Sequence, residues 1–536
     1  MSTARLDILV KNGRVLDGLG NPPRQTNIGI VGDTITYLGN EQPESSETID
    51  ASSKVVTPGF IDVHTHEDTW LLIHPDATEK LSDGVTTLIV GNCGFSAAPL
   101  LPEREKLIRD NSLNFADIPC NWNSMGDYLE RLNSVHLGVN VGTLVGHNTI
   151  RLNIMGTEKR PPANDELEQM KSLIRTGIEE GALGLSTGLI YVPGIYSDTD
   201  ELLELGKVVA DSHGVYTSHI RGEASTLRTA VTEALDIGRI ARVPVEISHH
   251  KASGRENWGS VRETLVMIEA ARKNSVEVNC DVYPYTAGNT GLGTLIPSWV
   301  FSNGLTEARN RITNPETRSR IIKEMMTPKV DEERPLIDTG AENILISYSE
   351  QDPSIEGKNL AELAEAHQVS PAEIVLDLVM KHGGSIHSIF IILFEMSEQD
   401  VETVLRHPLS MIASDSLNPI GRPHPRAFGT FSRVLARYVR EKQLLTLQDA
   451  VRKMTSMPSS KMGLVDRGII RLGNKADLAI FDQSSVRDMA TFQNPTQYSE
   501  GIDYVLVNGK IAWDHNEQTS LRAGTVLKHS PKLIRG

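Results

Sequence analysis

The sequence predicts an α/β protein with a (β/α)₈ barrel and a small β-sandwich that both chain ends build. Eight short apolar segments in the middle of the chain alternate with amphipathic stretches. Such alternation is typical of parallel strands linked by helices, and eight repeats favour a closed barrel. Further β-rich segments flank this middle on both sides. We also expect an insertion between the seventh and eighth barrel strands.

The two chain ends carry matching sets of short strand patterns. Residues 6–10, 27–31 and 34–38 each precede a glycine or asparagine that favours a turn. Near the other end, the corresponding patterns are residues 477–481, 504–507 and 510–513. We therefore expect one sandwich in two parts, residues 1–56 and residues 464–536.

The middle of the chain contains the eight barrel strands. Their expected positions are residues 60–63, 86–90, 139–145, 183–186, 215–218, 243–248, 276–281 and 409–414. Helical patterns lie between them, for example at residues 167–180, 202–213 and 261–274. We assign strands one to seven to residues 57–285, and strand eight with its closing helices to residues 406–463.

The interval before strand eight is too long for one strand–helix–strand unit. About 125 residues separate Tyr285 from Met411, whereas such a unit takes roughly 30. We expect residues 286–405 to form an insertion over the barrel mouth, together with the helix before strand eight. Residues 288–303 are rich in glycine, proline and serine and are expected to form a loop.

Composition excludes several classes of protein. The net charge is −16, from 69 acidic and 53 basic residues, so nucleic acid and membrane are not expected partners. No apolar run approaches the roughly 20 residues that span a bilayer, and the N-terminus lacks the apolar core of a signal peptide. Only Cys93, Cys120 and Cys280 are present, so we expect no disulfide framework. A cytoplasmic protein is predicted, and a homo-oligomer is left open.

Potential metal ligands follow five of the predicted strands. They are His64 and His66 after strand one, Cys93 after strand two, His219 after strand five, His249 and His250 after strand six, and Asp415 after strand eight. Barrel enzymes of this kind carry their functional side chains at these strand ends. Imidazole, thiolate and carboxylate groups are the ligands of zinc. Each residue alone would more often be an ordinary core or surface residue, but their convergence predicts a metal site.

Strand geometry decides only part of the ligand assignment. Alternate residues of a strand point to the same face, so His64 and His66 can bind one metal together. Neighbours point to opposite faces, so only one of His249 and His250 is expected at the site. The alternation leaves that choice open, because the last residue of a strand often twists away.

Several motifs resemble a known enzyme family. Residues 58–66, Pro-Gly-Phe-Ile-Asp-Val-His-Thr-His, resemble the opening motif of the amidohydrolase superfamily, and residues 468–482 resemble its return into the sandwich. Four narrower motifs are similar to those of the D-aminoacylase (N-acyl-D-amino-acid deacylase) family: residues 91–96, 186–194, 247–251 and 424–431. The resemblance extends from about residue 6 to residue 528.

The resemblance implies a zinc enzyme that hydrolyses the amide bond of N-acyl-D-amino acids. It implies one tight zinc site at Cys93, His219 and His249, and a second, weaker position near His64 and His66. Many members of the superfamily bridge two metals with a carboxylated lysine after strand four, but residues 185–188, Leu-Ser-Thr-Gly, contain none. The missing lysine and the presence of Cys93 agree with a thiolate in the bridging place. The preference for D over L comes from the resemblance alone.

The implied chemistry suggests roles for further residues. Asp415 is the candidate general base, and it is also a candidate metal ligand. Arg426 follows it by eleven residues, and its guanidinium matches the α-carboxylate of the substrate. Lys251, Tyr191 and Tyr283 are further substrate-binding candidates by resemblance, and Ser186 with Lys251 is an alternative nucleophilic pair.

Three alternative functions are compatible with the same fold. A cyclic-amide hydrolase of the hydantoinase or dihydroorotase kind would generally carry the strand-four lysine, which this sequence lacks. An amidohydrolase that acts on other N-acyl amino acids or on dipeptides would need the same metal ligands and general base as the deacylase. A scaffold protein on an inactive barrel would have lost ligands, but all of them are present.

Overall fold

The computed structural model describes residues 5–112, 117–327 and 333–530. Eight parallel strands form the expected barrel, with the third strand divided into β10 and β11. The strands are β8 (Phe60–Asp62), β9 (Val85–Val90), β10 (Asn140–Thr143), β11 (Val145–Gly146), β12 (Gly184–Gly188), β13 (Val215–His219), β14 (Val245–Ile247), β15 (Val278–Val282) and β19 (Ser410–Ile412). Each pairs in parallel with the next. A parallel bridge between Thr65 and Ser416 closes the barrel.

Amphipathic helices surround the barrel and bury their apolar faces against it. The main ones are α3 (Met125–Ser134), α5 (Asn164–Glu180), α6 (Thr199–Asp211), α7 (Leu227–Ala241), α8 (Val261–Lys273), α14 (Glu398–Arg406) and α16 (Leu447–Met454). Helix α6 is representative. The Asp198 side chain accepts the Glu201 N–H at its N-terminus, and Leu202, Leu205 and Val209 are buried at helical spacing. The helices expected at residues 167–180, 202–213 and 261–274 are thus confirmed.

The two chain ends share one β-sheet. Strand β7 (Val55–Pro58) pairs antiparallel with β20 (Leu478–Phe481), with Val56 opposite Ile480. The full order of this sheet is β23 (Glu517–Gln518), β22 (Lys510–Asp514), β21 (Ile502–Val507), β20, β7, β2 (Arg14–Val15) and β3 (Arg24–Gln25). A second sheet contains β5 (Thr34–Gly39), β4 (Asn27–Val31), β1 (Leu6–Lys11) and β6 (Ser45–Asp50). Ile28, Ile30 and Leu506 are fully buried in one core of these segments, and the expected sandwich is confirmed.

The insertion between β15 and β19 has its own sheet and core. Its elements are β16 (Gly288–Gly291), α9 (Leu305–Thr313), α10 (Pro315–Met325), α11 (Pro335–Thr339), β17 (Ile344–Ser349), α12 (Leu360–His367), α13 (Pro371–Lys381) and β18 (Ile389–Leu393). The sequence did not predict its strands. Residues 288–303 were expected to form a loop, but the first four form β16, because β18 pairs with them from about 100 residues away. Tertiary pairing here outweighs the weak strand preference of glycine.

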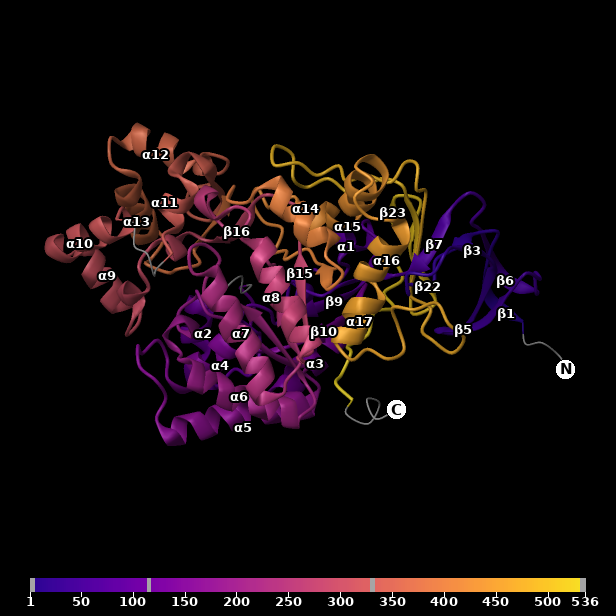
Figure 1. Cartoon of the computed structure of the whole chain (residues 1–536), viewed down its shortest axis with the longest axis horizontal. Coiled ribbons are helices and arrows are strands. Elements are labelled where there is room, and N and C mark those ends of the chain that lie inside the picture. Colours follow the sequence, from indigo (N-terminus) through magenta and orange to yellow (C-terminus); the bar gives the residue numbers. More distant parts are fainter. Residues whose placement is uncertain (1–4, 113–116, 328–332, 531–536) are drawn as a thin grey trace.

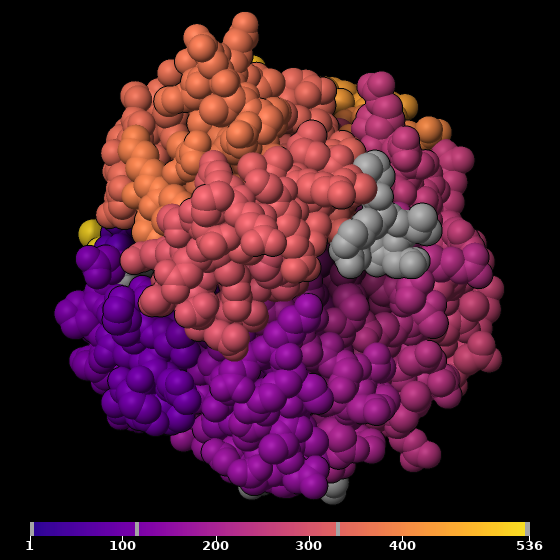
Figure 2. All heavy atoms as spheres, turned by 90° about the vertical axis from the view of Figure 1, so that its left-hand side faces the viewer, coloured from indigo at the N-terminus to yellow at the C-terminus, as the bar shows by residue number. Residues whose placement is uncertain are grey.

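The insertion lies at the opposite end of the molecule from the sandwich (Figure 1). Val192 and Tyr196, in the segment after β12, are buried in the same apolar core as the insertion, which therefore packs directly on the barrel mouth. Figure 2 looks onto this end, where the insertion occupies the upper part of the view and segments of the barrel lie below it. No helix among the described residues combines the length and apolar character needed to cross a bilayer.

A buried charge cluster fixes the seam between the first and eighth barrel strands. The side chain of Lys80 is only 2% exposed, and its Nζ lies 3.2 Å from Asp62, 3.1 Å from Glu67 and 2.5 Å from the Ser416 hydroxyl. These partners come from β8, from the loop after it and from the segment after β19. The cluster therefore holds together the two segments that carry the ligand candidates of strands one and eight.

Candidate metal centre

Six ligand candidates from five strand ends meet at the mouth of the barrel. They form two groups, one of His64, His66, Cys93 and Asp415, the other of Cys93, His219 and His249. Within each group the ligand atoms lie within 4.8 Å of one another, and all six residues are buried. Cys93 is common to both groups, so its sulfur occupies the position between two potential metal sites.

The distances show how tightly the groups are assembled. Cys93 Sγ lies 3.3 Å from His64 Nε2 and 3.5 Å from His249 Nε2. His249 Nε2 lies 2.8 Å from His219 Nδ1. In the other group, Asp415 Oδ1 lies 3.1 Å from His66 Nε2 and 3.4 Å from His64 Nε2. A bound cation at this cluster would therefore meet sulfur, imidazole and carboxylate donors, a set that suits zinc.

Three of the ligand candidates adopt the left-handed backbone conformation. The φ angles of Cys93, His249 and Asp415 are 50°, 35° and 50°. This conformation costs a non-glycine residue about 1–3 kcal/mol and is concentrated at functional sites. Gly91, at φ 80°, begins the Cys93 turn, and a Cβ there would lie 2.4 Å from the Leu144 carbonyl oxygen.

The left-handed turn at His249 explains which histidine reaches the cluster. Strict alternation places His250 on the same face as Glu246, which is buried beside Asp281. The strand ends at Ile247, and the turn at His249 reverses the alternation. His249 consequently joins the metal cluster, while His250 Nε2 lies 2.8 Å from the Thr264 hydroxyl and is directed away from it.

The charges of the cluster favour metal binding. Burial opposes the thiolate, but His64, His66 and His249 hold the pKa of the Cys93 thiol well below its usual range. Burial likewise opposes the carboxylate of Asp415, but Arg426 and His64 hold its pKa well below its usual range. Both groups are therefore available as anionic ligands at neutral pH.

Two carboxylates that the sequence interpretation did not single out orient the histidines. Asp281 Oδ2 lies 3.1 Å from His64 Nδ1, and its other oxygen accepts the His249 backbone N–H at 2.9 Å. Glu223 Oε1 lies 3.0 Å from His249 Nδ1 and 2.5 Å from Lys251 Nζ. Carboxylates in such positions fix the orientation of metal-binding imidazoles. Asp281 ends predicted strand seven, and Glu223 follows His219, the end of strand five, by four residues. These positions at or just after strand ends could have indicated from the sequence that both carboxylates lie near the metal site.

Arg426 is a buried cation with unused hydrogen-bonding capacity. It is the first residue of α15 (Arg426–Arg433), is 1% exposed, and its Nη1 lies 2.9 Å from Asp415 Oδ2. Its guanidinium stacks on the Tyr283 ring at 4.5 Å. Among the described residues, none accepts a well-directed hydrogen bond from its three side-chain nitrogens, and the Tyr283 hydroxyl also has no partner. Donors left in this state are suited to an anionic ligand.

The other substrate-binding candidates have more contacts. The Tyr191 ring lies 5.0 Å from that of His219, and its hydroxyl lies 3.2 Å from that of Thr290. Lys251 Nζ pairs with Glu223 and lies 2.8 Å from His249 Nδ1. Ser186 donates to the Gly91 carbonyl and accepts the Gly94 N–H. It thus supports the Cys93 turn, and the structure does not bring it together with Lys251 as a nucleophilic pair.

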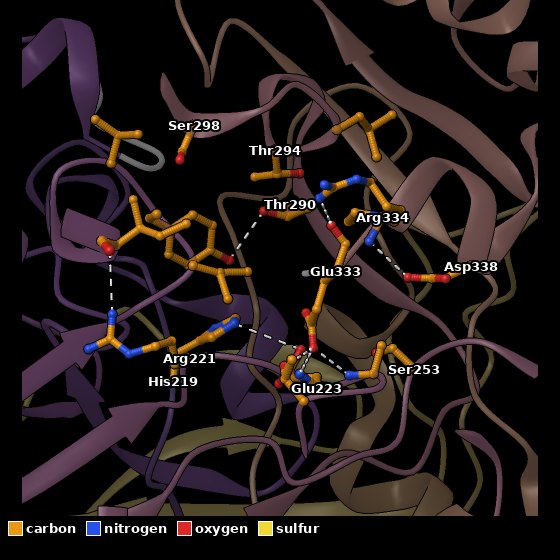
Figure 3. Close-up of a pocket in the computed structure, with 18 of the residues that line it drawn as sticks. His219, Arg221, Glu223, Ser253, Thr290, Thr294, Ser298, Glu333, Arg334 and Asp338 are labelled. Carbon is orange, nitrogen blue, oxygen red and sulfur yellow. Dashed lines mark hydrogen bonds and ion pairs between the residues drawn. The ribbon is translucent and has the colours of Figure 1, made fainter. Parts of the chain in front are cut away.

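The metal cluster opens into one large cavity, which we call the chamber. It measures about 950 Å³, with His66, His219, His249 and Asp415 at its base and residues of the insertion, such as Leu295 and Trp299, on its walls. Figure 3 shows polar residues of the chamber, including His219, Glu223 and Arg221. A substrate that reaches the metal cluster through the chamber contacts both the barrel and the insertion.

Known proteins are similar to this chain over nearly its whole length. Residues 47–319 and 346–512 match the profile of the amidohydrolase family. The chain is 35% identical to the D-aminoacylase of Alcaligenes xylosoxydans xylosoxydans, over 97% of each protein. It is also 35% identical to the N-acyl-D-aspartate deacylase of that organism, over 98% of this chain and 95% of the relative. Among solved structures, N-acyl-D-glutamate deacylase from Bordetella bronchiseptica matches with a TM-score of 0.84 at 34% identity, covering 98% of this chain and 100% of that one. That structure contains zinc and a phosphonate inhibitor that mimics the tetrahedral intermediate of the reaction.

Proposed function

We propose that this chain, which belongs to the amidohydrolase family, is a zinc-dependent hydrolase that cleaves N-acyl-D-amino acids into a carboxylate and a free D-amino acid. The three relatives described above are named for this activity and are matched along nearly their whole length. Their names also support the D configuration.

The observation that carries the proposal is the position of Cys93. Its sulfur belongs to both groups of ligand candidates, and β12, the fourth barrel strand, ends at Gly188 without a lysine. Cys93, His219 and His249 would hold one tightly bound zinc ion, and His64, His66 and Asp415 a second, weaker one. When bound, zinc polarises an amide carbonyl and lowers the pKa of water to about 7.

Asp415 would act as the general base. Its carboxylate is ionised at neutral pH, faces the chamber and lies beside His64 and His66. It would take a proton from the attacking water and deliver it to the departing nitrogen. The buried Arg426 keeps this carboxylate charged.

The α-carboxylate of the substrate would bind at Arg426 and Tyr283. These side chains are in contact, and among the described residues neither donates a well-directed hydrogen bond, although Arg426 forms an ion pair with Asp415. The carboxylate would accept from the guanidinium and from the phenol, and so place the scissile amide beside Asp415. Lys251 and Tyr191 line the chamber, as Tyr283 does, and would contact the substrate next to the metal centre.

The experiment that tests this function compares three substrates with zinc-loaded protein. We expect rapid hydrolysis of N-acetyl-D-methionine, and much slower hydrolysis of N-acetyl-L-methionine and of 5-substituted hydantoins. Faster cleavage of the hydantoin would instead indicate a cyclic-amide hydrolase. Equal rates for the two enantiomers would contradict the D preference.

A further inference from the structure

The residues that line the chamber indicate which amino-acid side chains the substrate can carry, a question that overall sequence identity to the relatives does not answer. The relatives named for D-amino acids in general, for D-aspartate and for D-glutamate are 35%, 35% and 34% identical to this chain. A second carboxylate on the substrate side chain would have to find a partner within the chamber, because the metal cluster opens there. The cations of the chamber wall therefore decide whether an acidic side chain is accepted.

Much of the chamber wall is apolar. Contributors from the barrel side include Ile190 and Val192, and contributors from the insertion include Leu295, Ile296, Trp299 and Phe301. Val192, Leu295, Ile296 and Phe301 are each no more than 4% exposed. Burying the apolar side chain of a substrate against such a wall is favourable, because it removes apolar surface from water.

The cations of the chamber wall are mostly neutralised already. Lys251 pairs with Glu223 at 2.5 Å, Arg221 with Glu233 at 3.0 Å, and Arg320 with Glu324 at 2.8 Å. Arg334 donates from its guanidinium to the Glu333 carbonyl, and its charge counteracts the effect of burial on the pKa of Asp338, which accepts the Arg334 backbone N–H. The fifth cation, Lys159, has no ion-pair partner in the described part of the chain, but it is exposed.

The chamber also holds more acidic groups than basic ones. Its described lining includes seven carboxylates and five lysine or arginine side chains. Burial raises the pKa of Glu333 and that of Glu395 to about 7, as expected where negative charge has too little compensation. Figure 3 shows Glu223 and Glu333 close together in this wall. An additional carboxylate would be desolvated without a free partner, which is unfavourable.

We propose that this chain selects N-acyl-D-amino acids with neutral, apolar side chains and discriminates against D-glutamate and D-aspartate. This selectivity rests on the proposed deacylase function. It follows from the pairing of the chamber's cations, and not from the metal centre.

The first test compares N-acetyl-D-glutamate with N-acetyl-D-glutamine, which has nearly the same shape but no side-chain charge. With zinc-loaded protein, we expect kcat/KM for the glutamine substrate to exceed that for glutamate at least tenfold, and N-acetyl-D-methionine to be better than both. A higher kcat/KM for glutamate would overturn the proposal. If that preference disappeared in Lys159→Met, Lys159 would be the cation responsible. Absence of hydrolysis of every N-acetyl-D-amino acid would instead contradict the proposed function.

The second test removes the ion-pair partner of one cation of the chamber wall, Arg221. In Glu233→Gln, Arg221 loses its anionic partner, so we expect the glutamate-to-glutamine ratio of kcat/KM to rise about tenfold. Glu263→Gln is the matched control, because Glu263 pairs with the exposed Arg228 outside the chamber. We expect no change of the ratio in that control. An unchanged ratio in Glu233→Gln would refute cation pairing as the cause of the selectivity.

Discussion

Replacement of Arg426 by alanine should impair recognition of the substrate's α-carboxylate more than it impairs the chemistry. Arg426 is fully buried, stacks on Tyr283, and has guanidinium donors available for an anionic ligand. Hydrogen bonds to charged groups contribute about 1.5–3 kcal/mol. Losing this contact should therefore lower kcat/KM by roughly 10- to 100-fold on an N-acyl-D-amino acid.

The ion pair between Arg426 and Asp415 adds a second, separable effect. Its 2.9 Å separation helps to hold the pKa of Asp415 well below its usual range, so the variant also weakens the base. That loss should affect every substrate. The carboxylate contact matters only for substrates that carry the carboxylate.

The assay therefore uses N-acetyl-D-methionine and its α-carboxamide analogue in parallel. In Arg426→Ala, the fall of kcat/KM should be about 10- to 100-fold larger for the acid than for the amide. Arg433→Ala is the matched control, because Arg433 lies on the same helix, stacks on Tyr285 at 4.6 Å and pairs with Asp488. Equal losses on the acid and the amide in Arg426→Ala would show that Arg426 is purely structural or acts only through Asp415.

Four further variants test other parts of the site and fold. Cys93→Ala should lose tight zinc and activity together, and wild-type zinc content in metal analysis would refute the ligand assignment. Asp415→Asn should keep its fold and most of its metal but lose about 10²–10⁴-fold in kcat, and near-normal turnover would place the base elsewhere. Asp281→Asn should weaken zinc affinity by about 10- to 100-fold in competition with a chelator, and unchanged affinity would mean that it does not orient His64. Lys80→Met should lower the free energy of unfolding by about 3–5 kcal/mol, because it leaves buried carboxylates without their cation. The control Lys106→Met removes the lysine of an exposed ion pair and should leave the free energy of unfolding nearly unchanged. Equal denaturation midpoints for the two variants would refute this reasoning.

The barrel and the sandwich were predictable because their signals are local. Each barrel strand is a short apolar run, and the C-terminal ends of the parallel strands lie at one face of the barrel, irrespective of the length and sequence of the loops between them. This rule is why residues as distant in sequence as His64 and Asp415 could be expected at one site, and the structure brings them together.

Features that depend on single side-chain contacts were not predictable. The partners His64 and Asp281 are 217 residues apart; the strand-end rule places both at the barrel mouth but does not indicate which side chains there make contact. Strand alternation could not choose His249 over His250, because the choice depends on one left-handed residue; only the family resemblance predicted it. The sheet of the insertion was missed because its glycine-rich strand β16 exists only through pairing with β18.

The most direct test of the account is to titrate zinc into metal-free protein while hydrolysis of N-acetyl-D-methionine and of its L enantiomer is followed separately. We expect no turnover without metal, a rise in D-specific hydrolysis as the first equivalent of zinc binds, and little hydrolysis of the L enantiomer throughout. Full activity of the metal-free protein, or equal hydrolysis of both enantiomers, would contradict a zinc-dependent deacylase specific for D-amino acids.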